Sequence, residues 1–411
     1  MRLGPFRSRW FVDHELAPVT DGSGVAIAGA ITGPAGGAEG LWVYVVPDLE
    51  AETDAQVVIS MVHDGDVYTG ALDLSGFASA SGDAAVLTGV AWSQVDLAAA
   101  GGSATDRAHV YAEGSHWMSH SIEADAELWL LQVDPADARG GGAVVTPSAA
   151  VKVYSESDST ALFYNDPSST GEYYSINDHF LVHVPGGIAV GIWRTGENAG
   201  DLSLKMIVVD TTTMALSAEY DIGGSASVEC NTTGSARQVP VPGTTIATGS
   251  RALEVLVPDQ IGDTGTQNNL NLLTTDDGFT AIVAATATYF ETDQHLQMGS
   301  FFRLENGDYV VAYKRIPITA NYSGGGGIYA KVSDWGDVML AVLDSSMSTT
   351  VLWSELLLEA GSSVDGAARA GNRPHVAQWR RYVFTCWDTY NVDPLNLAPA
   401  GTYLQINWLV A

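Results

Sequence analysis

The chain has 411 residues, and 18 basic against 48 acidic residues give it a formal net charge of −30 at pH 7. A surface of this charge repels phosphate backbones and anionic lipids, so we expect no nucleic-acid partner. No run of 18 apolar residues occurs, and we therefore expect no membrane insertion. The first nine residues are polar and basic with no apolar stretch behind them, which predicts no secretion signal.

Apolar residues come in runs of four to eight, bounded by Gly, Asp, Asn and Pro, and no helical periodicity is sustained. This pattern favours strands and predicts an all-β fold. In chain order, the first predicted strands cover residues 9–12, 25–30, 41–46 and 56–61. Residues 64–103 are interpreted as an insertion into this first unit that forms a projecting hairpin.

The pattern then repeats in units that cover residues 109–154, 180–222, 237–289, 301–358 and 376–410. The fifth unit is the clearest, because it contains four short strands separated by the turn Asn306-Gly307, a long Gly-rich loop and a turn after Asp344. Four strands joined in this way are typical of one β-propeller blade.

Five predicted third strands end at an aspartate that precedes a turn, namely Asp48, Asp134, Asp210, Asp276 and Asp344. Their spacings are 86, 76, 66 and 68 residues. Repetition at this period indicates a propeller. The sequence therefore predicts a six-bladed β-propeller, with five or seven blades or a β-sandwich assembly as the alternatives. The resemblance is to the architecture of the β-propeller superfamily over most of the chain, without the signature of any one family.

The sixth unit has only three predicted strands, whereas a spare strand precedes the first unit. If this spare strand becomes the outer strand of the last blade, the exposed sheet edges disappear. Residues 1–12 are thus predicted to be an N-terminal segment and closing strand, with residues 1–8 outside the ring. Residues 13–411 are predicted to form a single propeller domain.

Five of the nine histidines stand at the start of a predicted first strand, with Asp or Asn just upstream. Imidazole and carboxylate groups suit a metal or anion site. We favour a structural role, because each blade needs the same joint, and the pattern resembles the Gly-His position of WD40 propellers. No metal site is therefore predicted at these residues, which are Asp13, His14, His109, Asp178, His179, His295 and His375.

Aromatic residues in predicted loops are candidates for stacking on sugar rings or on a protein partner. They are Tyr173, Tyr174, Tyr322, Trp335 and Tyr390. Two acidic segments, residues 263–265 and 276–278, lack the alternating oxygen ligands of an EF-hand and are interpreted as tight turns. Calcium in acidic loops is the one cofactor that the sequence leaves open.

Sialidases are the relevant enzymes for comparison, since these propeller glycosidases need an arginine cluster and a tyrosine nucleophile with a glutamate partner. Arginines are available at positions 194, 303, 315 and 373, and tyrosines are numerous. The Asp-box turn usual in sialidases is absent, because Ser363-Val364-Asp365-Gly366 lacks the later Trp. Gly-x-Ser-x-Gly is absent as well, so we predict no catalytic residues.

The leading hypothesis is that the chain is a non-enzymatic structural or recognition component of a virus particle. The expected particle is a tailed phage, and the expected position is the tail, a fibre or a surface decoration. It rests on the lack of a catalytic motif and on a basic N-terminal segment, in which Arg2, Arg7 and Arg9 are candidate assembly contacts. The expected partners in this oligomeric virion assembly are other virion proteins and a host-surface glycan or protein. The alternative is an extracellular sialidase-like glycoside hydrolase or a secreted lectin-like propeller.

Overall fold

The computed structural model describes most of the strands and a part of the connections between them. The described residues are 2–3, 8–12, 41–47, 56–63, 65–73, 92–104, 106–122, 127–155, 173–195, 203–223, 238–239, 252–261, 266–291, 294–304, 306–317, 336–347, 350–359, 362–363, 368–379, 382–391 and 399–410. Most of this part of the chain is strand, and its one helix is the four-residue α2 (Pro135–Ala138). No helix here is long and apolar enough to cross a membrane.

The described strands form six antiparallel sheets, five of four strands and one of six. Sheet 1 contains β3 (Leu41–Pro47), β4 (Gln56–His63), β5 (Asp66–Asp73) and β6 (Ser93–Val95), and sheet 2 contains β7 (Asp106–Ala112), β8 (Ser115–Ile122), β9 (Glu127–Val133) and β10 (Ala149–Ser155). Sheet 3 contains β11 (Tyr173–Val184), β12 (Gly187–Thr195), β13 (Ser203–Val209) and β14 (Tyr220–Gly223).

The second half of the chain continues the series. Sheet 4 contains β15 (Gln238–Val239), β16 (Glu254–Ile261), β17 (Thr266–Thr275) and β18 (Ile282–Phe290), and sheet 5 contains β19 (Gln294–Arg303), β20 (Tyr309–Pro317), β21 (Asp337–Leu343) and β22 (Val351–Leu358). Sheet 6 contains β24 (Ala368–Trp379), β25 (Tyr382–Asn391) and β26 (Pro399–Val410), with β23 (Ser362–Ser363) beside β24 and both β1 (Arg2–Leu3) and β2 (Ser8–Val12) beside β26.

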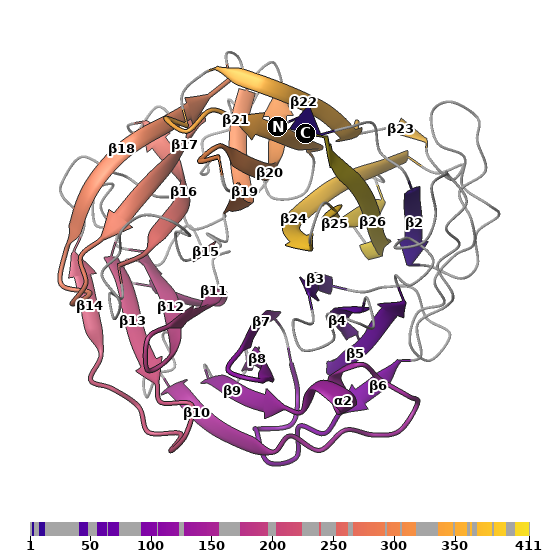
Figure 1. The fold of residues 1–411 in the computed structure, drawn as a ribbon, viewed down its shortest axis with the longest axis vertical. Helices are drawn as coiled ribbons and strands as arrows, with labels where there is room; N and C mark the ends of the chain where they lie inside the picture. The colour runs from indigo at the N-terminus through magenta and orange to yellow at the C-terminus, as the bar shows by residue number, and fades with distance from the viewer. Residues whose placement is uncertain are drawn as a thin grey trace.

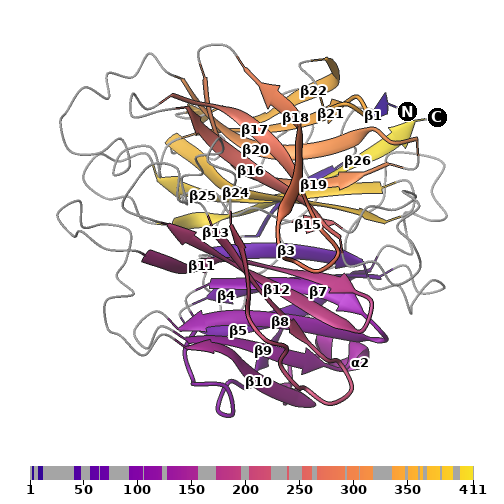
Figure 2. The same ribbon diagram turned by 90° about the vertical axis from the view of Figure 1, so that its left-hand side faces the viewer.

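The sheets follow one another around a common axis, with the first strand of each sheet nearest the axis (Figure 1). Each first strand contacts the next one, in the order β3, β7, β11, β15, β19 and β24, and β24 in turn contacts β3. Seen from the side, the strands run across the molecule between its two faces (Figure 2). This arrangement is an all-β, propeller-like fold.

Neighbouring sheets pack through apolar side chains, and sheets 2 to 5 do so on both of their faces. In β20, Val310 and Ala312 pack toward sheet 6, whereas Tyr309, Val311 and Tyr313 pack toward sheet 4. Successive side chains of a strand point to opposite faces, so a strand that is buried on both faces needs apolar residues at nearly every position. This is why the sequence shows continuous apolar runs in place of an alternating pattern.

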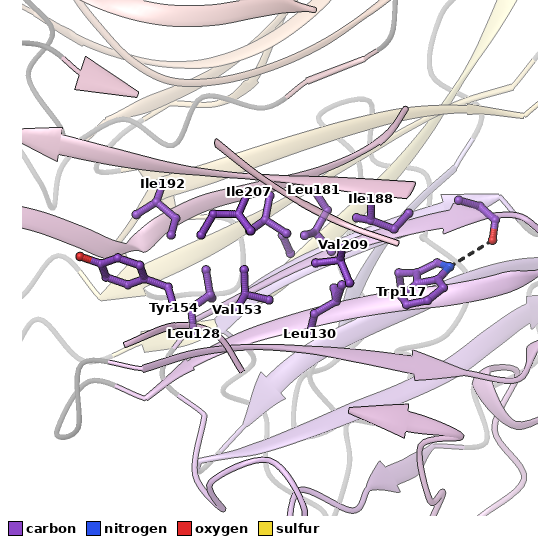
Figure 3. Packing of buried hydrophobic residues seen from close by; sticks show 13 residues of the cluster. Trp117, Leu128, Leu130, Val153, Tyr154, Leu181, Ile188, Ile192, Ile207 and Val209 are labelled. Atoms are coloured by element: carbon purple, nitrogen blue, oxygen red, sulfur yellow. Dashed lines mark hydrogen bonds between the residues drawn. The ribbon is translucent and has the colours of Figure 1, made fainter. Parts of the chain in front are cut away.

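The joint between sheets 2 and 3 shows this packing (Figure 3). Trp117 on β8 is fully buried there, and its Nε1 donates a hydrogen bond to the Ala112 carbonyl at 3.1 Å. On the other face of sheet 3, Phe180 lies over Gly191, where a Cβ would come within 1.8 Å of the ring. A glycine inside β12 therefore makes room for a large aromatic ring at the joint with sheet 4.

Four of the five predicted aspartates directly follow the third strand of their sheet, namely Asp134, Asp210, Asp276 and Asp344. Each carboxylate accepts hydrogen bonds from the turn that it begins. Asp210 Oδ1 accepts from the backbone N–H of Thr212 at 3.0 Å and of Thr213 at 2.7 Å, and these bonds lower the pKa of Asp210. The aspartates that repeat in the sequence thus mark turns that their own side chains stabilise.

The fifth aspartate was assigned wrongly. Residues 41–47 form the first strand of sheet 1 rather than its third, and the third strand is β5, which ends at Asp73. Asp48 itself and the predicted strand over residues 25–30 lie outside the described residues. Residues 64–103 accordingly supply β5 and β6 of sheet 1, in place of the projecting hairpin that the sequence suggested.

The N-terminal strand β2 pairs with β26, the last strand of the chain. β2 runs antiparallel to β26, from Ser8 opposite Ile406 to Val12 opposite Thr402. Residues 1–8 do not all run outside the ring, because β1 also pairs with β26 and places Arg2 opposite Val410. The two short strands lie end to end along the same edge of β26.

This pairing predicts the effect of truncation. Removal of residues 1–13 deletes β1 and β2 and exposes the edge of β26, so we expect a lower melting temperature and concentration-dependent aggregation. Removal of residues 1–5 deletes β1 alone and serves as the control, with a smaller loss. Calorimetry and light scattering measure both effects. A 1–13 truncation that stays monomeric and melts like the full chain contradicts the expectation.

Candidate functional site

The strand ends of each sheet are divided between the two faces of the ring. Neighbouring strands of an antiparallel sheet run in opposite directions, so one edge holds the start of the first strand, the end of the second and the start of the third. Tyr173 at the start of β11, for example, pairs with Thr195 at the end of β12. Arg315 near the end of β20 likewise pairs with Asp337 at the start of β21. We call the face of the ring where first strands begin the start face, and the other the end face. The backbone N–H of Gly371 donates to Gly336 O at 2.9 Å and thereby links the start-face ends of sheets 5 and 6.

An ion-pair network lies on the start face between sheets 4 and 5. Arg315, near the end of β20, contacts Glu291 Oε2 through Nη1 at 3.1 Å. Its Nε and Nη2 donate to Asp337 Oδ2, at the start of β21, at 3.1 and 3.0 Å. The Tyr313 hydroxyl donates to Glu291 Oε1. One guanidinium group thus links the end of β20, the start of β21 and the segment before β19.

The network is partly exposed, and one cation faces two carboxylates in it. The side chains of Arg315, Glu291 and Asp337 are 22%, 18% and 12% exposed. Burial opposes the charge on Arg315, but the charges and hydrogen bonds of Glu291 and Asp337 outweigh it and raise the pKa of Arg315 above its usual value. The guanidinium therefore stays charged and holds both carboxylates in place.

Tyr313 does not suit the role of a nucleophile. The residue is fully buried, and its ring packs in the apolar cluster between sheets 4 and 5. Because Tyr313 is fully buried, a sugar on the start face would not reach its hydroxyl. A nucleophile must contact the reacting atom, so Tyr313 cannot take this role in the arrangement described. The hydrogen bond from Tyr313 to Glu291 instead supports the position of the carboxylate.

The arginines suggested for a substrate-binding cluster are not all brought together. Arg303 lies at the end of β19, on the end face, where it contacts Glu254 Oε1 at 3.8 Å and lies 5.3 Å from the centre of the Tyr309 ring. Arg315 lies at the opposite end of the same pair of strands. Arg194 is at the start-face end of β12, and Arg373 is in β24.

Two of the predicted histidines join neighbouring sheets. His109 Nδ1 on β7 lies 2.6 Å from Ser60 Oγ on β4, and His179 Nε2 on β11 lies 2.6 Å from Ser119 Oγ on β8. In both cases the histidine is on the first strand of one sheet and the serine is on the second strand of the preceding sheet. The same contact therefore links sheets 1 and 2 and sheets 2 and 3.

The other predicted members of the histidine ring are placed differently. His375 is on β24, where its carbonyl oxygen lies 3.8 Å from Cys386 Sγ of the same sheet. His295 is on β19 and Asp178 is on β11, while Asp13 and His14 fall outside the described residues. In the part of the chain that is described, no group of three or more His, Cys, Asp or Glu residues is placed to hold a metal ion.

Three of the five predicted aromatic residues are described, and all three lie at strand ends on one face. Tyr173 and Tyr174 begin β11, and Tyr390 lies near the end of β25, so these three are in strands rather than loops and at the start face. Tyr322 and Trp335 lie outside the described residues, in the connection from β20 to β21, both ends of which are on the start face. The start face therefore combines the polar network with aromatic positions.

Other candidates do not add to this site. Asp276, in an acidic segment interpreted from the sequence as a tight turn, accepts hydrogen bonds from the Thr280 and Ala281 backbone at 2.6 and 2.9 Å and closes a turn on the end face. Residues 263–265 lie outside the described residues. Arg2 and Arg9 are in β1 and β2 along the edge of β26, and Arg7 is not among the described residues.

Sequence reasoning missed both the network around Arg315 and two buried histidines. His116 and His120 on β8 are fully buried, and His116 Nδ1 lies 2.8 Å from His109 Nε2. Their spacing of four residues in a strand places them on one face, which was the available signal. For the network, the signal was that Arg315 and Asp337 flank the Gly-rich loop between two predicted strands.

The network predicts the effect of changing Arg315. Substitution Arg315→Gln leaves two partly buried carboxylates without their cation, so we expect a loss of about 2 kcal/mol in unfolding free energy, reduced from the value for a fully buried pair by solvent screening. Arg315→Lys keeps the charge but loses the fork-shaped contact, and we expect a smaller loss. Denaturant unfolding measures both. Wild-type stability in Arg315→Gln shows that the network does not hold the strand ends.

No protein-family model matches the chain, and no curated protein matches it. Among solved structures, it is similar to a protein of unknown function from Dyadobacter fermentans DSM 18053, with 10% identity, a TM-score of 0.50 and coverage of 91% of this chain and 95% of that chain. A Trypanosoma rangeli sialidase gives 10% identity and a TM-score of 0.48 and covers 97% of this chain, which spans 57% of the sialidase. An N10 neuraminidase-like protein of A/little yellow-shouldered bat/Guatemala/060/2010 gives 9% identity, a TM-score of 0.44 and coverage of 90% and 95%. At these identities the similarity is one of fold.

Proposed function

We propose that the chain is a glycan-recognition β-propeller in which the six sheets are six blades. The N-terminal strands β1 and β2 complete the last blade and thereby close the ring. The cycle of contacts between first strands and the pairing of β2 with β26 support this architecture. A closed ring presents its strand ends on two rigid faces, and a rigid face is suited to recognition because little conformational entropy is lost on binding.

The start face is the proposed binding surface. The observation that carries the proposal is the network of Glu291, Arg315 and Asp337, a set of fixed polar groups on the face where Tyr173 and Tyr174 also begin β11. Sugars present apolar ring faces edged by hydroxyl groups, so a sugar site needs aromatic surface together with oriented donors and acceptors. The start face carries the polar groups, and we expect Tyr173 and Tyr174 to supply the aromatic surface.

A glycoside hydrolase is the second candidate. Glu291 and Asp337 are two carboxylates on the start face, and a pair of carboxylates is what most glycosidases use. Two observations favour recognition over hydrolysis. Both carboxylates already accept hydrogen bonds from Arg315, and Tyr313 is buried beneath them.

The virus-particle hypothesis draws no support from the fold or from the similar structures, so a virion location is not part of this proposal. A glycan-binding propeller is compatible with the recognition role that the sequence suggested. Assembly with other virion proteins, and the contacts of Arg2, Arg7 and Arg9, stay predictions from the sequence.

A glycan array tests the proposal directly. We expect the wild-type chain to bind a defined class of sugars and the double variant Tyr173→Ala/Tyr174→Ala to bind about tenfold or more weakly, since an aromatic contact contributes roughly 0.5–1.5 kcal/mol beyond its buried area and about 1.4 kcal/mol is a tenfold change in affinity. The matched control is Leu352→Ala/Leu356→Ala, which removes two exposed apolar side chains from the outer strand β22 and should bind normally.

A panel of fluorogenic glycosides separates the two candidates. Under the recognition proposal, no glycoside is hydrolysed. Turnover that is lost in Glu291→Gln or Asp337→Asn would establish the hydrolase instead. No binding to any glycan, together with no turnover, contradicts both candidates.

A further inference from the structure

Strand β22 forms the outer edge of sheet 5. The strand order of this sheet is β19-β20-β21-β22, and among the described strands β22 pairs with β21 alone (Figure 1). A strand at the edge of a sheet presents a row of backbone N–H and C=O groups that can pair with another chain. The outer edge of sheet 5 is therefore a place where a further strand can be added.

The two faces of β22 differ in burial. Trp353 packs on the apolar cluster between sheets 5 and 6, and Glu355 accepts hydrogen bonds from two amide side chains of β26 at 3.3 and 3.1 Å. Successive side chains of a strand alternate between its faces, so Leu352, Ser354 and Leu356 lie on the face turned away from sheet 6. All three are exposed, and the exposed fractions of Leu352 and Leu356 are 43% and 42%.

Most of the other outer strands are short, charged or covered, which are the usual protections of a sheet edge. β6 and β14 have three and four residues, β10 carries the exposed Lys152, and β26 is covered by β1 and β2. β22 has eight residues, and its one charged side chain, Glu355, is turned toward sheet 6. Half of the six large apolar side chains that are exposed in the described part of the chain lie on this strand, namely Val351, Leu352 and Leu356.

The exposed leucines are placed symmetrically about Ser354, which lies midway between Leu352 and Leu356 in the sequence. If two copies of β22 pair antiparallel with Ser354 opposite Ser354, Leu352 of each copy lies opposite Leu356 of the other. Side chains directly opposite in an antiparallel pair have Cβ atoms about 4.5–5.5 Å apart, so two leucine pairs form across the contact. A two-fold interface needs such a self-complementary patch, because both copies contribute the same surface.

The charge of the chain sets how such a contact responds to salt. Two copies with a formal charge of −30 each repel one another, and salt screens this repulsion. The contact itself is apolar, because leucines face each other and the carboxylate of Glu355 is turned toward sheet 6. We therefore expect salt to strengthen the association, whereas an interface built on ion pairs becomes weaker in salt.

We propose that β22 is a self-association surface, through which two copies of the chain form a two-fold dimer by antiparallel pairing of their β22 strands. The register of β22 on β21 shifts at Leu352 and at Leu357, so an unbroken stretch of four residues, 353–356, lies between the two bulges. A contact this short makes a weak, reversible dimer, with a Kd on the order of 10 μM. This inference does not depend on the glycan proposal.

The pairing leaves the proposed glycan surface open. β22 runs from the end face to the start face, so antiparallel pairing turns the start faces of the two copies in opposite directions. One flat array cannot contact both start faces of a dimer, so dimer formation adds no bivalent binding there. Loss of the dimer in Leu352→Ala/Leu356→Ala therefore leaves that variant valid as the array control.

Sedimentation equilibrium of the full chain, at concentrations from about 1 to about 200 μM, tests the proposal. We expect a monomer–dimer equilibrium whose Kd falls about tenfold between about 0.02 M and about 0.5 M NaCl, because salt screens the repulsion between the copies. A chain that stays monomeric over this range at the higher salt concentration overturns the proposal. A dimer that weakens as salt is added overturns it as well.

Charged variants test the two-fold register at about 0.15 M NaCl, where the Debye length of about 8 Å leaves opposed side chains unscreened. Leu352→Glu/Leu356→Glu and Leu352→Lys/Leu356→Lys each place like charges opposite one another, so both should lose the dimer. Leu352→Lys/Leu356→Glu places opposite charges together across the two-fold axis and should keep it. Val283→Ser, at a residue of the outer strand β18 that is 61% exposed, is the control and should dimerise like the wild type.

Each outcome decides. Wild-type dimerisation in either like-charge variant, or loss of the dimer in Val283→Ser, places the contact elsewhere and overturns the proposal. Loss of the dimer in the opposite-charge variant overturns the two-fold register. Melting temperatures check that the variants fold, and if one like-charge variant does not fold, the other like-charge variant and the salt response of the wild type still decide.

Discussion

Burial of each sheet between two others is the constraint on which the rest of the structure depends. A single sheet with apolar residues on both faces is not stable in water, and stacking around an axis covers both faces. Polar side chains also pair across these joints. Between sheets 5 and 6, for example, Glu355 accepts hydrogen bonds from Gln405 at 3.3 Å and from Asn407 at 3.1 Å. The joints therefore fix both the packing and the register of neighbouring sheets.

This constraint also decides where function can lie. The two faces of every sheet are used for packing, so the strand ends and their connections are the parts that can vary. Arg315 shows how the scaffold fixes such an end, because it bonds to Glu291 and Asp337 where β19, β20 and β21 meet at the start face. Strand pairing fixes the backbone at Tyr173 and Tyr174, which lie opposite Thr195 and Arg194 of β12.

Local signals in the sequence predicted the repeat well, because turn chemistry is local. Asp210 and Asp276 were recognised as strand ends, and the structure shows their carboxylates bonded to the turns that follow. The pattern failed in the first sheet. There, a strand-like run over residues 25–30 was counted as part of the first sheet, so residues 41–47 were assigned as its third strand although they form its first. Asp48 was therefore taken for the aspartate at the end of the third strand, which is Asp73.

The functional site was harder to predict for a physical reason. Arg315 and Glu291 are 24 residues apart in sequence and meet only when β19, which Glu291 precedes, has paired with β20. His116 bonds to His109 across a hairpin, yet only the register of that hairpin reveals it. Contacts that depend on the register of paired strands leave little trace in a single sequence, whereas an aspartate before a turn leaves a clear one.

The measurement that most directly tests the account is a hydrogen-exchange footprint of the wild-type chain with a bound sugar. The account predicts protection at the start face, in residues 173–174, 313–317, 337–339 and 388–391. Protection confined to the end-face turns, such as residues 113–114, 185–186 and 210–214, would contradict the assignment of the binding surface.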